Sequence, residues 1–117
     1  MNNDKLSPQV ARCASHSITE LAQYAPDMIV STAIIKKPTG HICVFAYDKG
    51  QKSEIKTSPF ENHLQVIHGT LELHINAEQY ALTEGQGFVI PAHFSHQFVA
   101  KEQFKMISTV IKSGYED

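Results

Sequence analysis

The chain has 117 residues, of which 42% are apolar, and its ten basic and twelve acidic residues give a formal net charge of −2. This length is typical of one ordinary domain, and the apolar share is enough to bury a core, which excludes a disordered chain. No stripe of Lys or Arg marks a nucleic-acid surface, and no apolar run approaches the roughly 18 to 20 residues that span a bilayer. We therefore expect neither a nucleic acid nor a membrane as a partner.

The start of the sequence and the two cysteines indicate the cellular compartment. The start, Met1 to Lys5, is polar, and the apolar run of an export signal does not follow it. Cys13 and Cys43 have no CxxC partner, so reduced thiols are the simplest interpretation. We therefore expect a cytoplasmic protein.

Residues 1–26 are expected to form an N-terminal extension that is partly helical. Ser7-Pro8 is typical of a first helical turn, because Pro is tolerated at the first helical position. Ser17 and Glu20 have the spacing of a capping box. Pro26 would end the helix that such a box begins.

From Met28 onward, short runs rich in β-branched residues predict strands, with turns that carry Gly, Pro or Asn between them. The predicted strands are 28–35, 41–47, 64–67, 71–75, 80–82, 88–90, 97–100 and 105–111. In 71–75, Leu and Ile alternate with Glu and His, as in a strand with one dry face. Strands at intervals of about 8 to 12 residues, with no long helical pattern between them, predict an all-β sandwich or closed barrel over residues 27–117.

A sequence motif narrows this fold class. Residues 85–96 (GQGFVIPAHFSH) resemble the second cupin motif, except that His93 stands where the motif has its second Gly. Residues 65–73 resemble the strand, turn and strand that close the first motif, with Gly69 at the turn. The chain is thus similar to the RmlC-like, conserved-barrel cupins. The resemblance implies a jelly-roll barrel, the double-stranded β-helix of cupins, with a short N-terminal helical segment added.

Three further stretches, 45–51, 58–61 and 104–106, look like those of small single-domain bacterial cupins, most of which have no assigned function. Those proteins are typically homodimers, so the resemblance implies a homodimer here. Cupins carry many different chemistries, so the resemblance says far less about activity than about fold.

The resemblance also indicates where a cupin would hold a metal ion. Its first motif supplies a His-x-His pair and a Glu or Gln, and in this chain those positions fall on Lys56, Ser58 and Asn62. The His of the second motif falls on His96. An ammonium group has no lone pair, a Ser hydroxyl is a poor ligand for Zn, Fe, Ni or Cu, and an amide oxygen is a weak one. We therefore expect a degenerate metal site and no resident cofactor.

Two other histidines leave an alternative open. His63 follows Asn62, so on a regular strand it points to the opposite face. His93 lies in a turn before His96, where solvent exposure is favoured, although a turn that folds back would bring it to the barrel mouth. A divalent transition metal held by His96 with displaced histidines is therefore disfavoured but still open.

The candidate ligand-binding residues are His96, Asn62, Ser58, Lys56, Phe60 and Phe98. His96 is either a core histidine satisfied by a hydrogen bond or a polar anchor for a ligand. Lys56 is either solvated or, if it points inward, in need of an anion, which would be an acidic ligand, Glu54 or Glu61. The apolar side chains expected to line the interior suit a small, partly apolar molecule, but they also fill small barrels unaided. They are Phe60, Leu64, Val66, Phe88, Phe98 and Met106.

Four functions are consistent with this pattern. The leading hypothesis is a barrel that binds a small molecule and is non-catalytic or of unassigned activity. The first alternative is a metal-dependent dioxygenase or isomerase that uses His96 with displaced histidines. A second is metal-free acid–base catalysis, as in sugar-nucleotide epimerases, which needs a His oriented by a carboxylate. A third, a sensor like the cupin domains of arabinose-type regulators, is disfavoured because no DNA-binding segment is recognised.

Overall fold

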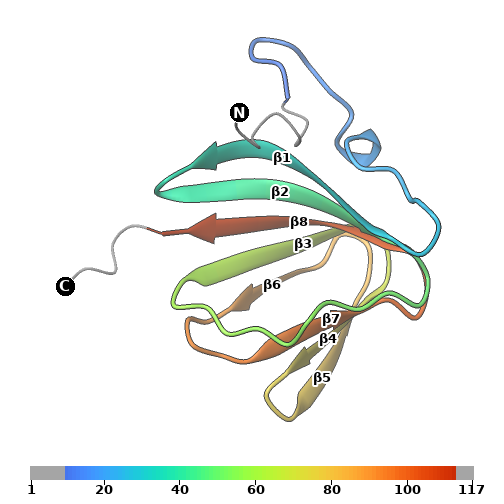
Figure 1. Cartoon of the computed structure of the whole chain (residues 1–117), viewed down its shortest axis with the longest axis vertical. Helices are drawn as coiled ribbons and strands as arrows, with labels where there is room; N and C mark the ends of the chain where they lie inside the picture. The colour runs from blue at the N-terminus through green and yellow to red at the C-terminus, as the bar shows by residue number, and fades with distance from the viewer. Residues whose placement is uncertain (1–9, 113–117) are drawn as a thin grey trace.

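The computed structural model describes residues 10–112, and these build two antiparallel β-sheets that face each other (Figure 1). Every strand predicted from the sequence is present, with ends that differ by up to three residues. The strands are β1 (Ile29–Lys37), β2 (Gly40–Tyr47), β3 (Glu61–Gly69), β4 (Leu71–Ile75), β5 (Glu78–Leu82), β6 (Gly87–Ile90), β7 (His96–Val99) and β8 (Phe104–Ile111). The predicted all-β class is therefore confirmed.

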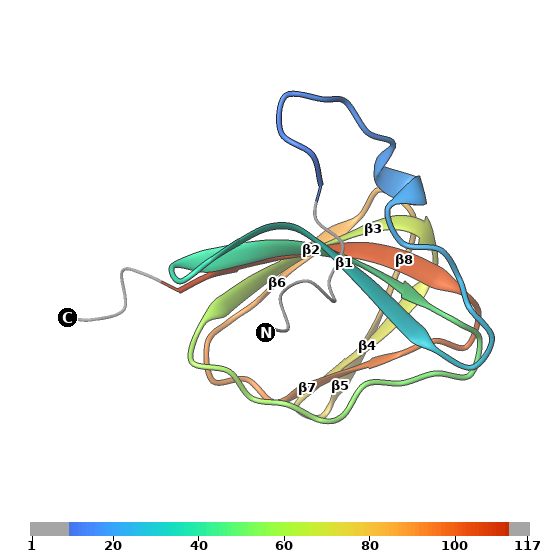
Figure 2. The same cartoon turned by 45° about the horizontal axis from the view of Figure 1, so that its top comes forward.

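The strand order shows how distant parts of the chain become neighbours. The larger sheet has the order β1-β2-β8-β3-β6, and the smaller has the order β5-β4-β7. The segment between β2 and β3 runs beside β7 (Figure 2). There Lys52 pairs with Val99, and Lys56 pairs with His96. This segment therefore extends the smaller sheet, although it is not a regular strand.

The space between the sheets is filled at one end and hollow at the other. At the filled end, the Tyr47 ring stacks on Phe104 with centroids 4.6 Å apart and meets Phe98 edge-on at 6.4 Å. Leu64 and Leu73 are fully buried in the same cluster. Burying a side chain of this size stabilises the fold by about 1.5–3 kcal/mol. Strand β8 begins at Phe104 in this packed region and leads away from it. Lys112 follows the end of β8 and lines the cavity at the hollow end.

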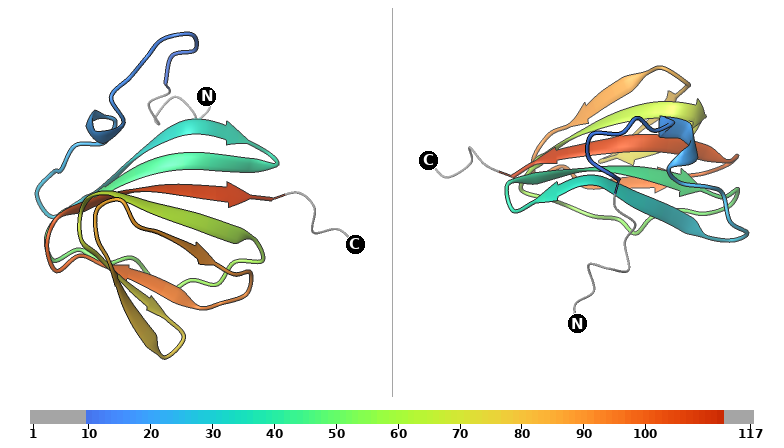
Figure 3. Two further views of the ribbon diagram at one scale, coloured as in Figure 1. Left: turned by 180° about the vertical axis from the view of Figure 1, so that it is seen from behind. Right: turned by 90° about the horizontal axis from the view of Figure 1, so that it is seen from above.

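The N-terminal segment lies on the outer face of the larger sheet, on the side away from the smaller sheet (Figures 2 and 3). Ala22, only 1% exposed, packs there in one cluster with Val44 and Ala46. Two hydrogen bonds attach the segment to the sheet. Thr32 Oγ1 donates to the Leu21 carbonyl at 2.6 Å, and Lys105 Nζ donates to the Thr19 carbonyl at 2.6 Å.

The helix expected after Ser17 is only a 3₁₀ turn, Ile18–Glu20. The Ser17 side chain makes no capping hydrogen bond, and the carbonyls of Thr19 and Leu21 accept hydrogen bonds from the sheet. A continuing α-helix would need those carbonyls for its own amide groups. The helical turn expected at Ser7-Pro8 lies outside the described residues. Within residues 10–112 no helix has the length and apolar character needed to cross a membrane.

Candidate functional site

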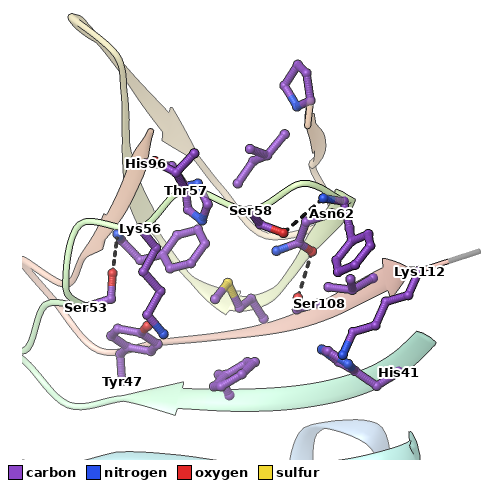
Figure 4. Close-up of a pocket in the computed structure, with 17 residues that line it drawn as sticks. His41, Tyr47, Ser53, Lys56, Thr57, Ser58, Asn62, His96, Ser108 and Lys112 are labelled. Atoms are coloured by element: carbon purple, nitrogen blue, oxygen red, sulfur yellow. Dashed lines mark hydrogen bonds between the residues drawn. The ribbon is translucent and has the colours of Figure 1, made fainter. Parts of the chain in front are cut away.

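A cavity of about 380 Å³ opens between the two sheets (Figure 4). That volume lies at the small end of the range of roughly 300–1,000 Å³ that is usual for ligand pockets. All six candidate ligand-binding residues line it: His96, Asn62, Ser58, Lys56, Phe60 and Phe98. The structure thus brings them to one place, and their role in binding stays a prediction.

The apolar residues expected to line the interior lie in three places. Met106 lines the cavity together with Phe60 and Phe98. Leu64 and Val66 do not line it and are buried in the core cluster, to which Phe98 and Met106 also belong. Phe88 is packed against Tyr80, with ring centroids 5.0 Å apart, beside a separate surface hollow. The barrel is therefore only partly filled by its own side chains.

His96 supplies a buried imidazole at the start of β7. It is 8% exposed, and its ring lies 5.5 Å from that of Phe98. Nδ1 lies 3.0 Å from the Phe94 carbonyl oxygen, and a carbonyl only accepts, so Nδ1 carries the proton of this hydrogen bond. Among residues 10–112 no partner is found for Nε2, so this nitrogen is left to interact with whatever occupies the cavity.

A row of small polar side chains forms another wall. Ser108 Oγ on β8 donates to Asn62 Oδ1 on β3 at 2.7 Å, which leaves the amide nitrogen of Asn62 as a donor. Ser58 Oγ accepts the Phe60 backbone N–H at 3.1 Å, and its own hydrogen is left to donate. This wall can hydrogen-bond a polar group of a ligand.

The side chain of Lys56 is exposed to solvent, as one prediction held, and also reaches the cavity, as the other held. The backbone of Lys56 pairs with His96, with each N–H donating to the other's carbonyl at 2.9 Å. In the cavity the side chain extends toward Tyr47 (Figure 4). Within residues 10–112 the ion pairs join other residues, so Lys56 is not matched by Glu54 or Glu61.

Two cavity residues with charge-bearing side chains were missed by the sequence analysis. His41 begins the inward face of β2, and Lys112 follows β8 beside it (Figure 4). Lys112 Nζ lies 5.9 Å from the centroid of the Phe60 ring. Burial lowers the pKa of His41, and Lys112 and Lys36 lower it further. The alternation of 41–47 could have placed His41 on the same face as Phe45 and Tyr47.

Comparison with solved structures identifies this architecture. A conserved protein of unknown function from Streptococcus pyogenes superposes with a TM-score of 0.83 at 29% identity, over 88% of this chain and 90% of that chain. A cupin superfamily protein from Desulfitobacterium hafniense gives 0.82 at 16% identity, over 87% and 94%. An RmlC-like cupin from Shewanella frigidimarina gives 0.73 at 15% identity, over 89% and 94%. The chain has the cupin fold.

The cupin resemblance predicted from residues 85–96 is therefore confirmed for the fold. No protein-family model matches the chain, and a comparison with curated proteins finds no match either. The function of this cupin-fold protein has to be argued from its cavity.

The side chains at the positions of the cupin metal ligands do not fit a transition metal. In residues 10–112 no group of three or more His, Cys, Asp or Glu side chains comes together as a metal site would require. His96 is the only imidazole at the four cupin ligand positions, and the oxygen of Asn62 is already bound to Ser108. One imidazole, one engaged amide, a hydroxyl and an ammonium do not make a tetrahedral or facial-triad site.

Neither displaced histidine lines the cavity. His63 projects from the outer face of β3, where its Nε2 would lie 3.1 Å from a Cβ added at Gly87 of neighbouring β6. His93 is exposed, and its φ of 70° is the left-handed conformation that suits the Gly of the cupin motif. Its N–H donates to the Ser58 carbonyl at 2.7 Å, which fixes the turn.

The acid–base alternative lacks its orienting carboxylate at His96, since a backbone carbonyl takes that position. A histidine and a carboxylate do meet at His74 and Glu72. They lie on the outer face of β4, because Leu71, Leu73 and Ile75 point into the core. That pair is therefore remote from the cavity.

Proposed function

We propose that this cupin binds a small organic molecule in its barrel and does so without a metal ion. The observation that carries the proposal is the set of side chains at the cupin metal positions, Lys56, Ser58, Asn62 and His96. These side chains line one accessible cavity and together offer a single imidazole. A cavity kept open at this place has room for a ligand other than a metal ion.

The walls suit a molecule with one polar edge and an apolar body. His96 Nε2 and the amide nitrogen of Asn62 offer complementary hydrogen-bonding groups to the polar edge. Phe45, Phe98 and Met106 offer apolar contact to the body. Mostly apolar walls with a few convergent polar groups are typical of small-molecule sites.

The test is a fragment screen by ¹H–¹⁵N NMR on tag-free protein. We expect hits that shift the amide signals of cavity residues such as Ser53, Thr57 and Ser108. The same hits should bind His96→Ala at least about tenfold more weakly, since a buried hydrogen-bonding anchor is lost. His63→Ala, on the outer face of the same barrel, is the matched control and should bind as the parent does.

Two results would overturn the proposal. One is a screen in which no fragment shifts the cavity signals at millimolar concentration. The other is a set of hits whose binding requires an added transition metal and disappears with a chelator.

A further inference from the structure

We infer that the ligand of this cavity is an organic carboxylate, with Lys112 holding its anionic group beside His41 and Lys56 adding a second cation. This inference rests on the proposed function and goes further, because it specifies the charge of the ligand and the residue that recognises it. Two of the residues involved, His41 and Lys112, lie outside the cupin motifs.

Among residues 10–112, the charge-bearing side chains that line the cavity are all basic. Its lining includes two lysines, Lys56 and Lys112, and two histidines, His41 and His96. Of residues 10–112, no Asp or Glu lines it. A concave site that carries one sign of charge between apolar walls concentrates the field and attracts ligands of the opposite sign.

Lys112 is the better placed of the two lysines. It is half-buried, its ammonium lies over the Phe60 ring, and within residues 10–112 it forms no ion pair. Burial is the main cause of the lowered pKa of His41, and the positive charges of Lys112 and Lys36 lower it further, because they repel the protonated imidazole. An anion placed here would relieve that repulsion.

The remaining walls limit the ligand further. Val110, which pairs with His41 across β2 and β8, and Phe60, beneath the Lys112 ammonium, lie at this end of the cavity and offer contact to an apolar or aromatic body. The charged groups are separate lysines, with no arginine among the lining residues. A single carboxylate needs fewer charged donors than a phosphate, which arginine forks or nests of backbone amides usually bind.

The experiment uses matched pairs that differ only in charge, such as phenylacetate and phenylacetamide. Binding to tag-free protein is followed by ¹H–¹⁵N NMR titration at constant ionic strength. We expect the carboxylate of each pair to bind at least about tenfold more tightly than the amide. Lys112→Met, which keeps the apolar stem, should remove most of this preference, and Lys112→Arg should retain it.

Lys49→Met is the control, because Lys49 is an exposed lysine that does not line the cavity. It should leave the preference unchanged, and the spectrum of each variant shows whether it is folded. Phenyl phosphate is the third arm of the series. If it binds more tightly than phenylacetate, the assignment to a carboxylate is wrong.

The outcomes separate this inference from the function on which it rests. Equal affinity for acid and amide, with both in the cavity, would overturn the inference and leave a metal-free binding cupin. A preference for the acid that persists in Lys112→Met would show that Lys112 is not the recognising residue. If no pair shifts the cavity signals at millimolar concentration, both the inference and the proposed function fail.

Discussion

Lys56 and His96 are joined by two backbone hydrogen bonds, each N–H donating to the carbonyl of the other residue at 2.9 Å. The motif resemblance assigns one residue to a ligand position of the first cupin motif and the other to the histidine of the second. The bridge between them holds these two segments side by side. In that alignment a lysine stands where the first motif has a metal-binding histidine.

His96→Ala should weaken ligand binding far more than it weakens the fold. The change removes Nε2 from the cavity and the hydrogen bond from Nδ1 to the Phe94 carbonyl. We expect a loss of about 1–2 kcal/mol in the free energy of unfolding and at least about tenfold in affinity for a fragment hit. Calorimetry and urea denaturation measure the two effects. Unchanged affinity in a folded variant would remove His96 from the site.

Gly69→Ala should be among the most damaging single substitutions in the barrel. Gly69 has a φ of 76°, and an added Cβ would lie 2.1 Å from the Gln103 carbonyl oxygen. We expect a loss of roughly 3–5 kcal/mol in the free energy of unfolding, from backbone strain and a clash that side-chain motion cannot relieve. Gly85→Ala is the control, with a φ of 89° and open space around it. It should cost only about 1–2 kcal/mol, and equal denaturation midpoints for the two variants would refute the argument.

Lys105→Met should loosen the N-terminal segment. Lys105 is 7% exposed, donates to the Thr19 carbonyl, and lies 4.9 Å from the centroid of the Tyr24 ring. Methionine keeps the apolar stem but leaves that carbonyl without its donor, at a cost of about 1–3 kcal/mol. Faster amide exchange over residues 19–24 would report the change. The exposed Lys101→Met should shift stability by no more than about 0.5 kcal/mol, and a similar shift in both variants would contradict this account.

His41 should titrate below the ordinary histidine value of 6.5, because burial and the charges of Lys112 and Lys36 favour its neutral form. A lowered pKa means that the unfolded chain binds the proton more readily. At a pH above the pKa of the unfolded chain, His41 is neutral in both states and does not affect stability. As the pH falls below that pKa, the unfolded chain takes up the proton first and the fold loses stability. NMR titration should show the pKa rising in Lys112→Met and unchanged in Lys49→Met. A midpoint at or above 6.5 in the parent protein would contradict the placement of His41.

The sequence predicted the fold well because its signals are local. Alternation in 71–75 and the Gly and Pro spacing of 85–96 are fixed by neighbouring residues, and the strands appear where they were expected. The prediction of a helix after Ser17 was wrong, and non-local contacts hold this segment instead: Lys105 and Thr32 donate to its carbonyls from the sheet. The homodimer that the resemblance implies stays a prediction.

Part of the site was also predicted from local sequence signals. Lys56, Ser58, Asn62 and His96 follow from motif spacing, and the structure brings them together. Lys112 lies beside His41 in the cavity because β2 pairs with β8 in one particular register. No motif encodes that register, so Lys112 was not found, whereas the alternation of 41–47 is a local signal that could have placed His41.

The most direct test of the central claim is the metal content of tag-free protein. It would be measured by elemental mass spectrometry after exposure to Zn²⁺ or Ni²⁺ and dialysis. We predict far less than one ion per chain for the parent. The variant that combines Lys56→His, Ser58→His and Asn62→Glu should hold about one, because it restores nitrogen and carboxylate ligands around His96. A parent protein that retains close to one ion per chain, and loses it in His96→Ala, would contradict the account.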